Sequence, residues 1–290
     1  MTKLQKLMVM GCMGLCTLTF TSCETLSSVS QGLLQGLPKP EVFFSNLSIA
    51  NLTESAAELD LTLDVKNPYP VPLFAKSLGF ALSSEGQQIL ESVSNEAINV
   101  RANSTDPVNL RVKLPYTQAL AALKSIKPGA VIPLTTAVDL SLSGQDVSPL
   151  NFNMERTTEV PIPTVPEVEV ESVKWDELSL SKAKATMNLS ILNTNSFPVD
   201  LEKLDYNFVM GKIPVAKGLI DDPISFASGE SQTLRIGFEL EPSQMGFAAF
   251  NMLRSKSLDY NLTGGFDAKT PFGPIEWALD KSDKTALIGK

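Results

Sequence analysis

Acidic side chains are the residues of this chain with the most chemistry to offer, because the sequence contains no histidine. Histidine is the commonest general base, the commonest metal ligand and the usual partner of a catalytic serine or cysteine. Triad hydrolases and histidine-built zinc sites are therefore excluded. Only carboxylate, lysine or tyrosine chemistry remains.

One acidic cluster has the spacing of a strand. Glu167, Glu169 and Glu171 alternate with Val168 and Val170, which would place three carboxylates on one strand face, where a divalent cation could bind. The three carboxylates are spread along a strand, without the clustered oxygen ligands and the glycine turn of a calcium loop. A solvated strand face is therefore the favoured interpretation, and we expect no metal site.

A second acidic pair lies in Asp221-Asp222-Pro223. Two neighbouring carboxylates suggest a cation site or one half of an acid/base pair, but no partner carboxylate can be placed beside them. Asp before Pro is typical of a turn that leads into a strand, and we favour that interpretation.

The two tryptophans, Trp175 and Trp277, are candidates for a ligand-binding platform. In the internal repeat described below, Trp277 holds the place of Phe152, a residue expected in the core. Packing is therefore the favoured role for the tryptophans, and we expect no cofactor.

The cysteines point to the membrane rather than to redox chemistry. Lys3 and Lys6 precede an apolar run, Leu7 to Phe20, of about 14 residues, which is too short to span a bilayer comfortably. The segment Phe20-Thr21-Ser22-Cys23 resembles the lipobox of bacterial lipoproteins, with Phe20 where Leu is usual. All three cysteines of the chain lie within the first 23 residues. We predict cleavage between Ser22 and Cys23 and lipidation of Cys23. The alternative is a plain signal peptide, or a membrane anchor, in which the cysteine occurs by chance.

The charge balance leaves a lipid as the means of membrane attachment. The chain has 24 Lys+Arg against 32 Asp+Glu, a formal net charge of −8, which argues against nucleic acid and anionic lipid surfaces as partners. Acyl chains on Cys23 would supply stable anchoring. By resemblance to such lipoproteins, Glu24 favours the outer membrane, facing the periplasm, if the host is Gram-negative.

The rest of the chain repeats itself at a displacement of 126 residues. Pro40-Glu41-Val42 recurs as Pro166-Glu167-Val168, and the alternation of Leu61, Leu63 and Val65 recurs further on. A two-residue insertion aligns Tyr69-Pro70-Val71 with Phe197-Pro198-Val199. A repeat this long indicates two tandem domains of one fold.

The domain boundaries follow from this repeat. We predict a signal peptide over 1–22, a lipidated tether over 23–39, a first domain over 40–156, a linker over 157–166 and a second domain over 167–290. The linker contains Pro161, Pro163 and Pro166 and is expected to form an extended polyproline-like spacer.

Apolar and polar residues alternate through most of each domain, as in Leu110, Val112 and Leu114, which is typical of half-buried strands. One short helix per domain is expected, capped by Thr117 or Ser243. The predicted fold class is all-β, with two tandem antiparallel, immunoglobulin-like or fibronectin-like β-sandwiches.

The strand that runs into an Asn-Pro turn carries a family resemblance. Residues 61–73, LTLDVKNPYPVPL, resemble the late embryogenesis abundant type 2 proteins, also called the WHy (water stress and hypersensitive response) domain. The second copy has Asn193-Thr194-Asn195-Ser196-Phe197-Pro198, with Thr194 where the family often has proline. We assign the turn residues a structural role; they are Asn67, Pro68, Tyr69, Pro70, Asn193, Asn195, Phe197 and Pro198.

The resemblance implies a seven-stranded sandwich per domain, no catalytic centre and an association with dehydration or other stress. Its partners would be client proteins or another envelope protein. An apolar-ligand or lipid carrier is the alternative function. A carboxylate-dependent enzyme is a third hypothesis.

Overall fold

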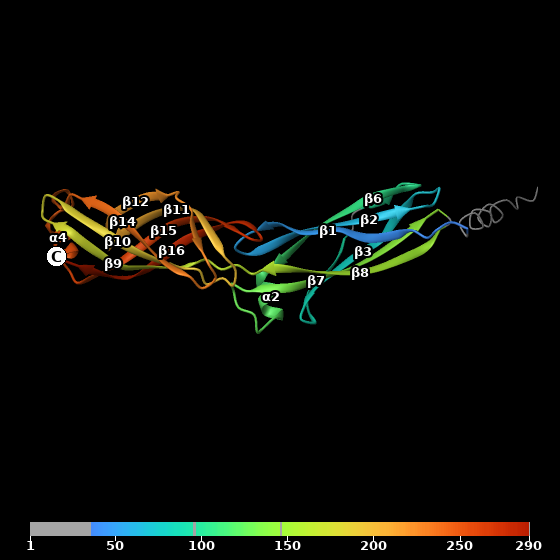
Figure 1. The fold of residues 1–290 in the computed structure, drawn as a ribbon, viewed down its shortest axis with the longest axis horizontal. Coiled ribbons are helices and arrows are strands. Elements are labelled where there is room, and N and C mark those ends of the chain that lie inside the picture. The colour runs from blue at the N-terminus through green and yellow to red at the C-terminus, as the bar shows by residue number, and fades with distance from the viewer. Residues whose placement is uncertain (1–35, 95–96, 146, 290) are drawn as a thin grey trace, which may run out of the picture.

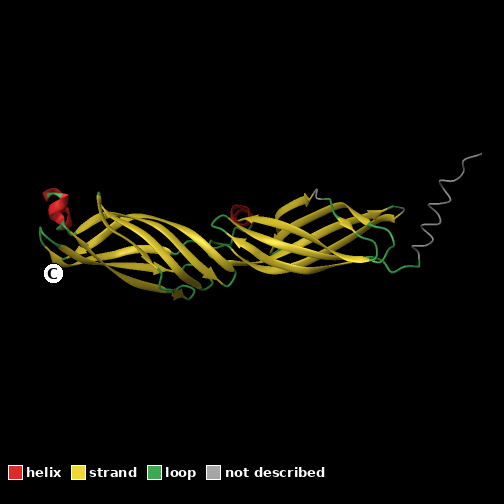
Figure 2. Cartoon of the chain, turned by 90° about the horizontal axis from the view of Figure 1, so that it is seen from above, coloured by secondary structure: helices red, strands yellow, loops and turns green. Residues whose placement is uncertain are grey.

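The computed structural model describes residues 36–94, 97–145 and 147–289. Strands dominate it, and they form two β-sandwiches placed end to end in an elongated rod (Figures 1 and 2). The predicted fold class, all-β with two tandem antiparallel sandwiches, is confirmed. The N-terminal and C-terminal ends of the described chain lie at opposite ends of the rod (Figure 1).

The first sandwich has two separate sheets, in the orders β1-β2-β6 and β4-β3-β7-β8, with β5 pairing with β3. Its elements are β1 (Glu41–Leu52), β2 (Ala56–Asn67), β3 (Leu73–Ser84), β4 (Gln87–Ser94), β5 (Asn99–Val100), β6 (Ser104–Pro115), α2 (Tyr116–Ala122), β7 (Val131–Gly144) and β8 (Val147–Pro161).

The alternation in the sequence explains why these segments are strands. In β2, Leu59, Leu61 and Leu63 point into the core and are almost fully buried, while the residues between them are partly exposed. Successive side chains of a strand point to opposite faces, so this pattern suits a sheet with one solvated face.

The second sandwich repeats these elements. They are β9 (Glu167–Leu178), β10 (Ala183–Leu192), β11 (Val199–Met210), β12 (Ile213–Ile220), β13 (Ile224–Phe226), β14 (Ser231–Leu240), α3 (Pro242–Met245), α4 (Phe247–Leu253), β15 (Ser257–Thr270) and β16 (Gly273–Ile288). The displacement is 126 residues at the starts of β1 and β9, β3 and β11, and β7 and β15.

One pairing distinguishes the two sandwiches. In the second, the end of β16 pairs in parallel with β9, Ala286 opposite Ser172 and Ile288 opposite Lys174. This pairing joins the strands into one sheet in the order β12-β11-β15-β16-β9-β10-β14, with β13 attached to β11. Among the described residues, β8 pairs only with β7, and β1 only with β2.

Several details differ from the sequence prediction. Among the described residues each sandwich has eight strands rather than seven, and the second has two short helices, α3 and α4, rather than one. Neither Thr117 nor Ser243 caps a helix: α2 begins after Pro115, α3 after Glu241, and no side-chain cap bond forms at either. In addition, β8 continues to Pro161, so a strand covers the first half of the segment predicted as linker. Backbone pairing with β7 carries this extended segment as a strand as far as Pro161.

Candidate functional site

The Asn-Pro turn of the first sandwich is organised by the buried side chain of Asn67, the last residue of β2. Its Nδ2 donates to the carbonyl oxygens of Val71 at 2.9 Å and Arg101 at 3.0 Å, and its Oδ1 accepts from the N–H of Tyr69 at 3.0 Å. One amide therefore satisfies backbone groups of two separate segments, which is why this position needs asparagine. Pro68 and Pro70 complete the turn, and Tyr69 is buried.

Asn193 makes the same bonds in the second sandwich. Its Nδ2 donates to the carbonyls of Phe197 at 2.9 Å and Ala227 at 3.1 Å, and its Oδ1 accepts from the N–H of Asn195 at 3.0 Å. Each of these partners lies 126 residues after its counterpart in the first turn. The turn is thus built identically in both copies.

This geometry corrects the two-residue insertion in our alignment. Tyr69 corresponds to Asn195, not to Phe197, and Leu73 corresponds to Val199, because both turns have the same length. Phe197 occupies the position of Val71 and packs edge-on against Phe272 at a centroid distance of 5.5 Å. Pro198 follows it and is exposed.

Asn195, which stands where the first sandwich has Tyr69, binds the linker through its side-chain amide. Its Oδ1 accepts from the N–H of Thr164 at 2.9 Å, and its Nδ2 donates to the Thr164 carbonyl at 3.0 Å. The next residue, Ser196, donates its N–H to the Gly129 carbonyl of the first sandwich at 2.7 Å. The second turn therefore fixes the contact between the sandwiches.

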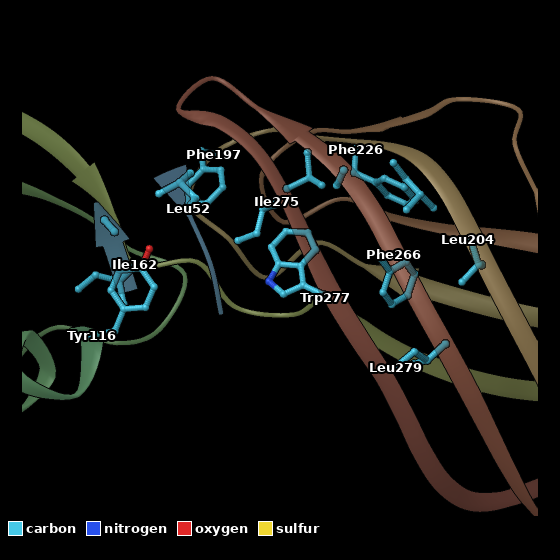
Figure 3. Packing of buried hydrophobic residues seen from close by; sticks show 14 of the residues in the cluster. Leu52, Tyr116, Ile162, Phe197, Leu204, Phe226, Phe266, Ile275, Trp277 and Leu279 are labelled. Atoms are coloured by element: carbon cyan, nitrogen blue, oxygen red, sulfur yellow. The ribbon is translucent and has the colours of Figure 1, made fainter. Parts of the chain in front are cut away.

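Further contacts complete this junction. Gly129 has φ +92°, and a Cβ there would lie 2.8 Å from the Thr194 carbonyl, so only glycine fits. The Glu54 carboxylate accepts from the N–H of Ala278 at 2.7 Å. Figure 3 shows Leu52, Ile275 and Trp277 in the apolar packing at the junction.

An ion pair supports the first turn. Asp106 accepts from the backbone N–H of Arg101 at 2.7 Å, from the Arg101 guanidinium at 2.6 Å and from Ser104 Oγ at 2.8 Å. The hydrogen bonds from Arg101 hold the pKa of Asp106 well below its ordinary value. Asp106 thereby positions the Arg101 carbonyl that Asn67 binds.

The acidic candidates are not assembled into a site. Glu167, Glu169 and Glu171 are all exposed on β9, and Asp221 and Asp222 lie in an exposed loop between β12 and β13. Within the residues described, no three acidic or cysteine side chains are grouped so that they could hold a metal ion. A hollow of about 590 Å³ lies at the junction, where Glu54 already binds Ala278.

Both tryptophans are buried in the core rather than exposed on a surface. Trp175 and Trp277 are each 3% exposed, and Trp175 contacts Phe238 edge-on at a centroid distance of 6.2 Å. Trp277 lies opposite Phe266, as Phe152 lies opposite Leu140. The packing interpretation is confirmed.

The predicted lipidation site, Cys23, and the predicted cleavage after Ser22 lie outside the described residues. None of the helices in the part of the chain that the structure describes is long and apolar enough to cross a membrane.

In a comparison with known protein families, the family described as late embryogenesis abundant protein matches this chain twice. The two matches cover residues 62–157 and 188–283. The chain belongs to this family. Each match falls within one sandwich, so the duplication is a duplication of the family's domain.

Two named relatives come from plants. The desiccation protectant protein Lea14 homolog of Glycine max is 24% identical over 46% of this chain and 87% of its own length. The late embryogenesis abundant protein Lea14-A of Gossypium hirsutum is 22% identical over the same shares.

Solved structures give distant likenesses. A late embryogenesis abundant protein in solution is 17% identical, with a TM-score of 0.35, over 49% of this chain and 83% of its own. A crystal structure of a protein from Archaeoglobus fulgidus is 14% identical, with a TM-score of 0.27, over 43% of this chain and 98% of its own.

Proposed function

We propose that this chain is a non-enzymatic envelope lipoprotein that protects other proteins during desiccation or related stress. The observation that carries the proposal is the late embryogenesis abundant match, which recurs in both sandwiches. The name of the Glycine max relative, a desiccation protectant, supports the same role. The finer designation as a WHy domain rests on the turn residues quoted above.

The membrane attachment is part of this proposal. Acyl chains on Cys23 would anchor the protein to the cell envelope, at the outer membrane facing the periplasm in a Gram-negative cell. The described chain starts at one end of the rod, so an anchor at Cys23 would let both sandwiches extend away from the bilayer (Figure 1). Client proteins or an envelope protein are the proposed partners.

Metabolic labelling with an alkyne fatty acid tests the anchor. The wild-type protein is expected to take up label, and Cys23→Ala is expected to lose it. Cys16→Ala is the matched control and keeps the label. Equal labelling of wild type and Cys23→Ala would overturn the membrane placement.

Drying of a labile enzyme tests the protective role. The purified protein is expected to preserve more activity after drying and rehydration than an equal mass of an unrelated acidic β-sandwich protein. Equal recovery with both would remove the protective role and leave only binding.

An apolar-ligand or lipid carrier is the second candidate, and one observation favours it. Apolar residues along β1 of the first sandwich are only half-buried. Native mass spectrometry of the purified protein tests this candidate, because a carrier is expected to retain a lipid. The absence of co-purified lipid, together with no binding of a fluorescent fatty acid, would count against it.

A further inference from the structure

The first sandwich has an open seam between β1 and β8. The two strands run in the same direction along the domain (Figure 1), and neither pairs with the other among the described residues. Their counterparts in the second sandwich, β9 and β16, are joined by parallel pairing at Ser172–Lys174 and Ala286–Ile288. The same fold thus has one open seam and one closed seam.

Two prolines explain the difference. Val131 lies opposite Pro161 and Ser257 lies opposite Ala286, so Pro161 occupies the place of Ala286. Pro163 likewise occupies the place of Ile288. Proline has no N–H to donate, so Pro161 and Pro163 cannot donate ladder bonds at the positions that close the second seam.

Bulges in β1 do not account for the open seam. The pairing of β1 with β2 skips Ser45 and Ala50. The pairing of β9 with β10 skips Glu171 and Asp176, which lie 126 residues later. Because β9 still pairs with β16 between its bulges, the prolines are the difference that matters.

Apolar residues are only partly covered along the open seam. Four inward positions of β1 between its start and Ile49 are half-buried, whereas the matching positions of β9 are between 0 and 4% exposed. The β1 residues are Val42, Phe44, Leu47 and Ile49, and their β9 counterparts are Val168, Val170, Val173 and Trp175.

The edge of β1 also lacks a hydrogen bond from a backbone N–H to a tyrosine hydroxyl, which β9 has. The N–H of Val170 donates to Tyr260 Oη at 3.2 Å. The residue at the place of Tyr260 in the first sandwich is Leu134, which has no acceptor to offer. A hollow of about 370 Å³, lined by Ile49, Thr158, Glu159, Pro271 and Phe272, marks the junction end of the seam.

We propose that the seam between β1 and β8 binds an extended apolar peptide segment, which adds as a strand to the free edge of β1. The inference rests on the proposed protective function, because an unfolding client protein exposes such segments. Main-chain hydrogen bonds to β1 would give affinity, and the half-buried apolar residues would receive alternate side chains of the peptide. About seven extended residues reach from Val42 to Ile49.

Two features of the seam favour a peptide over a fatty acid. An acyl chain cannot use the hydrogen-bonding groups on the free strand edge, whereas a peptide backbone can. In addition, the exposed residues Glu155 and Glu159 outnumber Arg156 on β8, in a chain that is acidic overall. This rim repels a carboxylate and attracts a peptide with lysine at its ends.

The test uses the purified protein and a fluorescein-labelled peptide with valine or phenylalanine at alternate positions, threonine between them and lysine at both ends. The wild type is expected to bind it with one-to-one stoichiometry. A control peptide with proline at two central positions is expected not to bind. Binding of both peptides, or of neither, overturns the proposal.

Exchanging the prolines tests the mechanism in both directions. The double variant Pro161→Ala/Pro163→Ile is expected to close the seam and to weaken binding at least tenfold. The reverse variant, Ala286→Pro/Ile288→Pro, is expected to open the second seam and to raise the stoichiometry towards two. Unchanged binding in the first variant contradicts the proposal.

Hydrogen exchange on the wild type keeps the proposal testable if a variant fails to fold. Peptide is expected to slow exchange at β1 and to leave exchange at β9 unchanged. Slowing elsewhere but not at β1 would place the peptide at another surface. If fatty acid displaces the peptide from β1, the seam is an acyl site and the peptide proposal is wrong.

The drying assay and the peptide-binding assay test the protective role and the peptide site independently. Loss of protection in the drying assay, with peptide binding intact, would remove the protective role and leave the seam as a binding site. Protection without peptide binding would remove the seam as the site and leave the protective role.

Discussion

At the scale of single residues, one asparagine organises each turn. Asn67 and Asn193 are both 1% exposed, and each bridges its own turn to a loop 34 residues further along the chain. A buried amide that satisfies several backbone groups is costly to remove, because those groups then stay buried without partners.

Asn67→Ala is therefore expected to lower the free energy of unfolding by about 3 kcal/mol. Asn109→Ala is the matched control, because Asn109 is exposed and bonds only Thr62 Oγ1, at 3.0 Å, among the side-chain bonds of the described residues. The control is expected to change stability by less than about 0.5 kcal/mol. Urea unfolding followed by circular dichroism measures both, and equal losses would contradict the role given to Asn67.

Asp106 makes the stability of the first sandwich dependent on pH. Its pKa is lower in the folded protein than the ordinary 3.8, so its contribution is fully present above that value and is lost as the pH falls below it. Asp106→Asn is expected to be less stable than wild type at pH 7, and the difference is expected to shrink below about pH 4. Urea unfolding across pH 2 to 7 measures this, and a constant difference would contradict the assignment.

Among the strands, β11 and β15 of the second sandwich approach each other closely at a glycine. Gly264 of β15 lies opposite Tyr206, and a Cβ there would meet the Asp205 carbonyl oxygen at 2.0 Å. No side chain fits at this distance without moving one of the strands, so the glycine keeps the two strands paired.

Gly264→Ala is expected to destabilise the second sandwich by about 3 kcal/mol or more. Gly237→Ala in β14 is the matched control, because nothing lies within 4 Å of the Cβ that it would add. The control is expected to be neutral or slightly stabilising. Thermal unfolding by calorimetry compares the two, and a tolerated Gly264→Ala would show that β11 and β15 can move apart.

At the scale of the whole molecule, the rod depends on the junction. Asn195 holds both backbone groups of Thr164, and Glu54 accepts the N–H of Ala278. These bonds, with the apolar contacts around Leu52 and Trp277, explain why the two sandwiches stay in line (Figure 3).

The double variant Asn195→Ala/Glu54→Ala is expected to bend at the junction while both sandwiches stay folded. Small-angle X-ray scattering is expected to show a shorter average maximum dimension than in wild type. Lys182→Ala is the control, since Lys182 pairs with Glu239 on the second sandwich and is expected to leave the scattering unchanged. An unchanged rod in the double variant would mean that the remaining contacts, which are the Ser196–Gly129 bond and the apolar packing, set the junction.

The fold class and the duplication follow from the residue pattern alone. Side chains of a strand alternate between two faces, so residues such as Leu61 and Leu63 predict a half-buried strand without knowledge of its partners. The first turn asparagine was also predictable, because Asn67 stands before Pro68 and Asn before Pro favours a turn, whereas Asn193 stands before Thr194 and was recognised through the repeat. Predicted features of residues 1–35, including lipidation of Cys23, stay predictions.

The equivalence of residues between the two turns, and their contacts, became clear from the folded chain. The insertion that we placed at Tyr69 aligned similar aromatic residues, whereas the hydrogen bonds of Asn67 and Asn193 show turns of equal length. The open seam between β1 and β8 also could not be predicted from the sequence. Whether Pro161 prevents a pairing depends on which strand lies beside it, and strand neighbours are chosen by contacts between residues far apart in the chain.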